Sequence, residues 1–181
     1  MLVEKGGNDR YDAPPEDLFL LGTFLGNFSG PILVSSEVGA LAFLLEEGGD
    51  DTYLCEGWVR QPCQSGAGVG AVAVLHEAGG NDRYVLGPEL VAPILGVLHV
   101  FPTGQAAVYG PSAPPGPGVA LLRDLAGDDE YVAVELAQAW STLGLALLLD
   151  EGGVDLYTLP GRGDGLTWTG GLGGVGRDSG T

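Results

Sequence analysis

The chain has 181 residues, of which 45% are apolar, and its 24 acidic and 7 basic side chains give a formal net charge of −17. The apolar content argues against intrinsic disorder, and the 33 glycines follow no Gly-x-y triplet, which excludes collagen. The acidic balance disfavours nucleic acids and anionic membrane surfaces as partners, because both are bound through basic faces.

Five copies of one short motif follow each other along the chain. Each copy has an apolar run, a carboxylate, a Gly or Ala followed by Gly, an aspartate, and a tyrosine two residues after that aspartate. The motif aspartates are Asp9, Asp51, Asp82, Asp129 and Asp155, and the motif tyrosines are Tyr11, Tyr53, Tyr84, Tyr131 and Tyr157. The upstream acids, five residues before each motif aspartate, are Glu4, Glu46, Glu77, Asp124 and Asp150. This pattern predicts a repeat protein, whose repeats we number 1 to 5.

The repeats are separated by unequal lengths of chain. Successive motif aspartates are 42, 31, 47 and 26 residues apart. We expect the shortest interval to be near the minimal repeat and the longer ones to carry inserted loops. The predicted insertions are Asp12–Asn27 and Phe101–Pro117. The prolines of the second, from Pro111 onward, suit neither a central strand nor a helix interior.

The apolar run of each repeat fits a strand better than a helix. Val134–Glu151 alone suits a helix, because it is rich in Ala, Leu and Gln and ends at Gly-Gly. The equivalent part of repeat 3, however, holds Gly66, Gly68 and Gly70, each of which would cost a helix about 1 kcal/mol. As strands, the runs place small residues on one face, at Ala42, Ala73, Ala120 and Ala146. Larger residues then point outward, at Phe43, Val74, Leu121 and Leu147.

A strand, a tight Gly-Gly turn and a second short strand in each repeat predict an all-β fold. The expected architecture is a parallel β-solenoid, or β-helix, of about five irregular rungs with inserted loops. Residues 1–181 then form a single repeat domain, or a fragment of a longer array, because Thr167–Thr181 resembles the glycine-rich stretch before repeat 3. Asp178 lacks a tyrosine and an upstream acid and is not counted as a sixth copy. A propeller of tandem hairpins and a leucine-rich α/β solenoid are the alternatives.

Stacked rungs would align the motif aspartates, and likewise the upstream acids, in columns along one edge. Like charges at this spacing repel each other unless something compensates them. One compensation is for each motif aspartate to accept hydrogen bonds from the N–H groups of its own turn, as in Asx turns. The other is a hard cation, calcium, between carboxylates and turn carbonyls. The predicted metal ligands are Asp9, Asp51, Asp82, Asp129 and Asp155.

Two of the turns resemble a known family. Gly6–Tyr11 and Gly79–Tyr84 both read Gly-Gly-Asn-Asp-Arg-Tyr and are similar to the Gly-Asn-Asp-x-apolar core of RTX-type calcium-binding β-roll repeats. The resemblance implies that turn carbonyls and Asp9 or Asp82 bind calcium between rungs. It covers about six residues in each repeat, and the family's nine-residue repeat is uninterrupted, unlike the longer repeats here. The motif is also similar to Gly-Gly-Asp-Asp-x-Tyr repeats of uncharacterised bacterial proteins, which imply no activity.

The motif tyrosines would form a further column. A stacked and buried ladder of rings would fix the register of the rungs, each ring adding about 0.5–1.5 kcal/mol beyond its area burial. Stacking against a carbohydrate is the alternative use of such a row of rings.

No catalytic residue is assigned. His76 and His99 have no partner at a readable spacing, and Ser35-Ser36 lacks a Gly-x-Ser-x-Gly frame. The predicted function is a non-catalytic structural or binding repeat module, stabilised by calcium. One alternative is a polysaccharide-active β-helix enzyme, with a non-repeat acid such as Glu89 in a cleft walled by the insertions. The other is an adhesion or assembly fragment that self-associates through its outward apolar residues.

Calcium is the predicted cofactor, and a surface polymer or a second copy of the chain is a predicted partner. We expect an extracellular or cell-surface location, although no signal peptide is visible at Met1–Lys5. No apolar run reaches the roughly 18 residues needed to cross a bilayer, so no membrane insertion is expected. Cys55 and Cys63 would form a disulfide outside the cell or stay free thiols inside it.

Overall fold

The computed structural model describes residues 2–13, 29–30, 35–36, 41–55, 64–67, 70–87, 90–92, 98–100, 105–108, 118–133, 137–141, 144–158 and 174–178. All regular elements in these ranges are strands, and none of them is helical. The predicted all-β class is therefore confirmed for this part of the chain.

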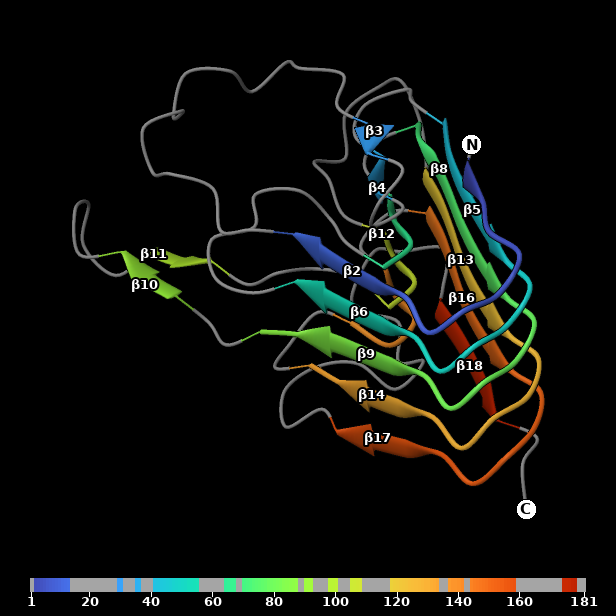
Figure 1. The fold of residues 1–181 in the computed structure, drawn as a ribbon. Helices are drawn as coiled ribbons and strands as arrows, with labels where there is room; N and C mark the ends of the chain where they lie inside the picture. Colours follow the sequence, from blue (N-terminus) through green and yellow to red (C-terminus); the bar gives the residue numbers. More distant parts are fainter. Residues whose placement is uncertain are drawn as a thin grey trace.

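The strands form three sheets and one separate hairpin (Figure 1). Sheet A has the order β1 (Leu2–Val3), β5 (Leu41–Glu46), β8 (Val72–Glu77), β13 (Gly118–Asp124), β16 (Gly144–Asp150) and β18 (Gly174–Asp178). Sheet B has the order β2 (Arg10–Ala13), β6 (Thr52–Cys55), β9 (Arg83–Leu86), β14 (Glu130–Val132) and β17 (Leu156–Thr158). Sheet C contains β3 (Ser29–Gly30), β4 (Ser35–Ser36), β7 (Gly66–Ala67), β12 (Ala107–Val108) and β15 (Trp140–Ser141). The hairpin pairs β10 (Leu90–Ala92) with β11 (Leu98–Val100).

The chain visits the three sheets in the same order in successive repeats. It passes through β5, β6 and β7, then through β8, β9 and β12, and then through β13, β14 and β15, each time from sheet A to B to C. Neighbouring strands in sheets A and B therefore belong to consecutive repeats, and all of their pairings are parallel. In sheet C only β3 and β4 pair antiparallel.

The register of the pairing aligns equivalent motif positions. In sheet A, Asp124 pairs with Glu77 on one side and with Asp150 on the other. In sheet B, Tyr84 and Tyr131 are partners in the same way. Residues at equivalent positions of the sequence motif are therefore neighbours in adjacent strands of the structure.

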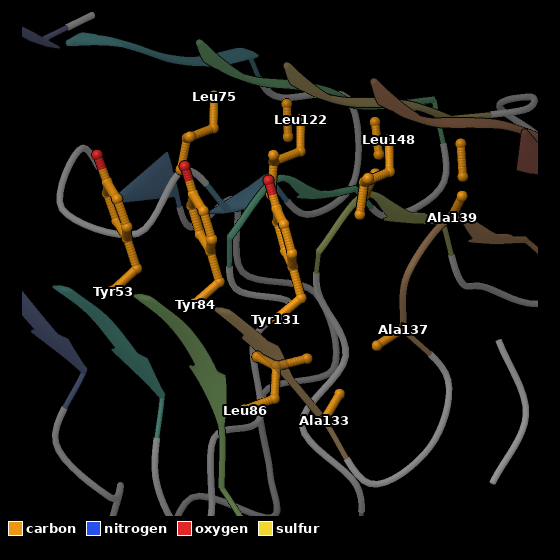
Figure 2. Packing of buried hydrophobic residues seen from close by; sticks show 14 of the residues in the cluster. Tyr53, Leu75, Tyr84, Leu86, Leu122, Tyr131, Ala133, Ala137, Ala139 and Leu148 are labelled. Atoms are coloured by element: carbon orange, nitrogen blue, oxygen red, sulfur yellow. The ribbon is translucent and has the colours of Figure 1, made fainter. Parts of the chain in front are cut away.

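The core is built from equivalent positions of consecutive repeats. Along β8, Ala73 and Leu75 are fully buried, whereas Val74 and His76 are half-buried on the other face, so the predicted alternation is confirmed. Figure 2 shows a row of tyrosines from sheet B beside a row of leucines from sheet A. These residues are Tyr53, Tyr84 and Tyr131, and Leu75, Leu122 and Leu148, each at most 2% exposed. The outward residues Phe43, Leu121 and Leu147 are half-buried like Val74.

The structure changes the prediction of the insertions. Asp12 and Ala13 belong to strand β2, and the predicted insertion Phe101–Pro117 contains strand β12 of sheet C. The interval between Asp82 and Asp129 instead carries the β10–β11 hairpin, which lies apart from the three sheets (Figure 1). Residues 14–27, 101–104 and 109–117 of the predicted insertions, and Cys63, lie outside the described residues.

Strand β18 gives Asp178 a place that the sequence did not suggest. Asp178 pairs with Asp150, so it occupies the position of an upstream acid rather than that of a motif aspartate. Gly174 and Gly176 pair with Ala146 and Leu148 of β16. The segment therefore begins like a sixth repeat and continues sheet A.

In repeats 2 to 5 the second glycine of the turn is required by a close approach between backbones. Gly80 has a φ of +149°, and a Cβ atom there would lie 1.5 Å from the carbonyl oxygen of Gly49 in the preceding repeat. Gly49, Gly127 and Gly153 would meet their predecessors at 1.3 to 1.5 Å. No side chain fits at this spacing, whereas at Gly152 the nearest atom would be 3.4 Å away.

We expect Gly80→Ala to lower the free energy of unfolding by at least about 2 kcal/mol, because it forces two stacked turns apart and strains φ. Gly152→Ala is the matched control, since repeat 4 already has Ala126 at the equivalent position. Chemical denaturation followed by circular dichroism measures both. Equal losses in the two variants would contradict the close approach at Gly80.

Candidate functional site

The motif aspartates connect consecutive repeats. The backbone N–H of Asp51 donates to Oδ1 of Asp82 at 2.7 Å, and that of Asp82 donates to Oδ1 of Asp129 at 2.7 Å. The same bond joins Asp9 to Asp51 at 2.6 Å and Asp129 to Asp155 at 2.9 Å. Each carboxylate thus accepts from the preceding repeat. The hydrogen bonds predicted within each aspartate's own turn are replaced by bonds between repeats.

The upstream acids are buried acceptors for the motif tyrosines. The hydroxyls of the first three motif tyrosines each donate to the upstream acid of the next repeat. This carboxylate also accepts an N–H from its own turn, as Glu77 does from Ala78 at 3.2 Å. This pairing was not predicted from the sequence, although the constant spacing of acid and tyrosine is its signal. The bonds are Tyr11 to Glu46 at 2.8 Å, Tyr53 to Glu77 at 2.7 Å and Tyr84 to Asp124 at 2.7 Å.

Repeat 5 closes this series differently. Asp150 accepts from Tyr157 of its own repeat at 2.8 Å. The hydroxyl of Tyr131 is buried and makes no well-formed hydrogen bond, although it lies close enough to Asp150 to favour the charged carboxylate. The tyrosine-to-acid bond between repeats is therefore described for the first three tyrosines only.

The motif tyrosines form a continuous stack, so the predicted ladder is confirmed. Ring centroids are 4.9 Å apart from Tyr11 to Tyr53 and from Tyr53 to Tyr84, and 4.7 Å apart in the next two pairs, with planes within 7°. Tyr53, Tyr84 and Tyr131 are fully buried. Both faces of these three rings are covered by neighbouring motif tyrosines, which leaves no ring face on them for a carbohydrate.

A second ladder runs along the exposed edge, one residue before the motif aspartates. The side-chain oxygen of Asp50 accepts the N–H of Asn81 at 2.9 Å, and that of Asn81 accepts the N–H of Asp128 at 3.0 Å. Asp128 accepts the N–H of Val154 at 2.9 Å. Here the side chain accepts from the following repeat, opposite in sense to the motif aspartates. Val154 can occupy the last position of this ladder because only its backbone N–H is needed there, as the donor to Asp128.

Three glutamines missed by the sequence analysis fix the corners that lead into sheet C. Gln105 Nε2 donates to the carbonyls of Tyr84 and Val132, in consecutive repeats, at 2.9 and 3.0 Å. Gln64 and Gln138 make the same bridge one repeat earlier and one later. Each glutamine has a positive φ between 49° and 53°, a conformation unusual for a residue with a side chain. The Gln-Ser or Gln-Ala pair recurs in the sequence, but outside the motif and at variable distances from it.

Burial raises the pKa of the stacked carboxyls. The pKa of Glu77 is raised to about 9 and that of Asp82 to about 7, mainly because burial removes water from the charged form and further because other carboxylates lie near. The pKa of Asp150 is raised to about 6, and those of Asp124 and Asp129 also rise, all chiefly through burial. The acid columns therefore favour a compensating positive charge, either a proton or another cation.

The two columns meet in two clusters of three carboxylates. One cluster is Asp82, Asp124 and Asp129, and the other is Asp129, Asp150 and Asp155, with oxygens within 4.8 Å of one another. Three of the predicted metal ligands are thus brought together with two upstream acids that were not predicted. Asp9 and Asp51 join no such cluster among the described residues.

The other candidates of the sequence analysis stay outside these clusters. His76 is half-buried on the outer face of sheet A, between Leu45 and Arg123. His99 lies in β11, and Ser35 and Ser36 form β4. Glu89 lies outside the described residues.

Comparison with known proteins adds no relative. The chain matches no family model, no curated protein and no solved structure. The resemblance to RTX-type repeats therefore stays a prediction. Among the residues that the structure describes there is no helix suited to crossing a membrane.

We expect the protein, freed of divalent cations, to lose stability as the pH rises. The folded-state pKa values of about 6 to 9 exceed the ordinary values near 4. At pH values between these two limits the folded chain therefore binds more protons than the unfolded chain. This contribution is complete below about pH 4 and is lost as the pH rises through 6 to 9. The thermal midpoint should thus be lower at pH 9 than at pH 5.5, by about 2–4 °C for each kcal/mol lost.

Glu77→Gln serves as the control for this pH dependence. The amide oxygen still accepts from Tyr53, but the side chain no longer titrates, so the slope of the midpoint against pH should become shallower. A midpoint that rises from pH 5.5 to pH 9 in the parent chain would contradict the raised pKa values.

Proposed function

We propose that this chain is a parallel β-solenoid that serves as a non-catalytic structural module. One repeat makes one turn of the solenoid, by passing through sheets A, B and C. The observation that carries the proposal is the in-register contact of identical residues in consecutive repeats, above all the tyrosine stack with ring spacings of 4.7 to 4.9 Å. This spacing equals the distance of about 4.7–4.9 Å between hydrogen-bonded strands.

The use of the acids supports a structural role over a catalytic one. Glu77, Asp82, Asp124 and Asp129 are each at most 2% exposed, and their bonds run to neighbouring turns or repeats. A catalytic acid pair has to reach a substrate and would be a local exception to the repeat. These four carboxylates instead occur at positions that every repeat fills with an acid.

The wider role of the module rests on expectations from the sequence. Self-association through the outward apolar residues, binding to a surface polymer and an extracellular or cell-surface location stay predictions. Leu41 and Leu145, at the start of their strands, are 63% and 38% exposed and belong to the same outer face of sheet A.

Thiol cross-linking across sheet A tests the solenoid. Leu145→Cys is combined in turn with Val119→Cys, Val72→Cys or Leu41→Cys, which lie one, two and three strands away in register. Their distances from position 145 should be about 5, 10 and 14 Å. Cys55→Ser and Cys63→Ser remove the native thiols from the background.

The expected result is a ranking of cross-link yields by reagent length. The shortest reagent should link only the 119/145 pair, and the 41/145 pair should require a span near 14 Å. Thermal melts of each variant control for loss of the fold. Efficient linkage of 41/145 by the shortest reagent, in a folded variant, would rule out the proposed stack.

A further inference from the structure

The described residues contain one compact group of three acids that is buried throughout. Asp82 and Asp129 are each 2% exposed and Asp124 is fully buried. One oxygen from each carboxylate lies within 4.8 Å of one from the other two. The group joins two repeats, since Asp82 belongs to repeat 3 and the other two to repeat 4.

Two carboxylate oxygens of this group accept no hydrogen bond. Oδ1 of Asp82 accepts the N–H of Asp51, and Oδ1 of Asp129 accepts the N–H of Asp82. Oδ2 of Asp82 and Oδ2 of Asp129 are buried and have no hydrogen-bond partner. Asp124 is served by the Tyr84 hydroxyl at 2.7 Å and by a weaker N–H bond at 3.4 Å. These two buried carboxylate oxygens therefore lack a hydrogen-bond donor.

No basic side chain in the described part of the chain donates a hydrogen bond to these two oxygens. Arg83 pairs with Glu130 and Arg123 pairs with Glu151, and these four side chains are at least 37% exposed. A buried acceptor without a donor is unfavourable, and three adjacent carboxylates repel each other. A cation that ligates the free oxygens removes both penalties.

We propose that Asp82, Asp124 and Asp129 bind a hard divalent cation, and that calcium fits this site best. Oxygens on opposite sides of a calcium ion, at about 2.4 Å each, are about 4.8 Å apart, and one oxygen from each of the three carboxylates lies within that distance of the others. Further ligands come from second carboxylate oxygens or water. The cation links repeat 3 to repeat 4. The proposal rests on the stacking of repeats proposed above.

This site differs from one that uses turn carbonyls. The carbonyl oxygens of Gly48 and Gly79 already accept N–H groups of the preceding repeat, at 3.1 and 3.0 Å. The three-acid clusters occur where the upstream acid is an aspartate, at Asp124 and Asp150, and not where it is Glu46 or Glu77. The shorter side chain thus marks the site within the repeat.

Calcium binding is measured on the full chain at pH 8, with calcium chloride against chelator at matched ionic strength. We expect calcium to raise the thermal midpoint by several degrees and to give saturable binding in calorimetry. Asp124→Asn keeps an acceptor for Tyr84 but removes a ligand charge, so it should weaken calcium binding at least tenfold. Asp82→Asn should weaken it similarly, and it replaces Asp124→Asn if that variant does not fold.

Asp128→Asn is the matched control. It removes one exposed carboxylate from the neighbouring position, where repeat 3 already has Asn81, and keeps the acceptor for Val154. Its calcium response should equal that of the parent chain. No calcium response in a parent chain that passes the cross-linking test would overturn the metal site alone. Equal loss in Asp128→Asn and Asp124→Asn would overturn it in favour of general charge screening.

Discussion

The spacing of about 4.8 Å between parallel strands governs the rest of this structure. Aromatic rings, carboxylates and turns of one repeat must all fit against the same groups of the next repeat at this distance. Stacked tyrosines suit it, because their ring centroids lie 4.7 to 4.9 Å apart. Turns suit it only with glycine, as at Gly80, where the backbone of the preceding repeat leaves no room for a Cβ. Carboxylates suit it only when their charge is compensated.

Acids are nevertheless useful in such turns, because a tight turn exposes N–H groups that no sheet satisfies. A carboxylate is a pure acceptor and takes these donors without offering a competing one. Asp82 accepts a backbone N–H from the preceding repeat, and Glu77 accepts a tyrosine hydroxyl and an N–H of its own turn. The same burial that strengthens these bonds disfavours ionisation. Burial of these carboxylates therefore both strengthens the hydrogen bonds between repeats and favours a compensating positive charge.

The sequence was sufficient to predict which equivalent positions of the repeats would align with one another. It identified the strand alternation around Ala73 and Leu75, the alignment of the motifs and the tyrosine stack. It did not reveal which repeat each hydrogen bond reaches, because an aspartate can bond within its own turn or to a neighbour with the same spacing. Gln105 was missed because its distance from the motif varies between repeats. Asp124 was grouped with the glutamates, since only the packing separates the shorter acid from the longer one.

The two edge ladders run in opposite senses, since the motif aspartates accept from the repeat before them and the residues one position earlier accept from the repeat after them. Every internal repeat thus presents one pattern to its predecessor and the complementary pattern to its successor. Duplication or deletion of a whole repeat would restore both junctions without any further change. A change inside one repeat, by contrast, disturbs two junctions. The length of this chain can therefore change most easily by the gain or loss of whole repeats, whereas single substitutions in its turns are poorly tolerated.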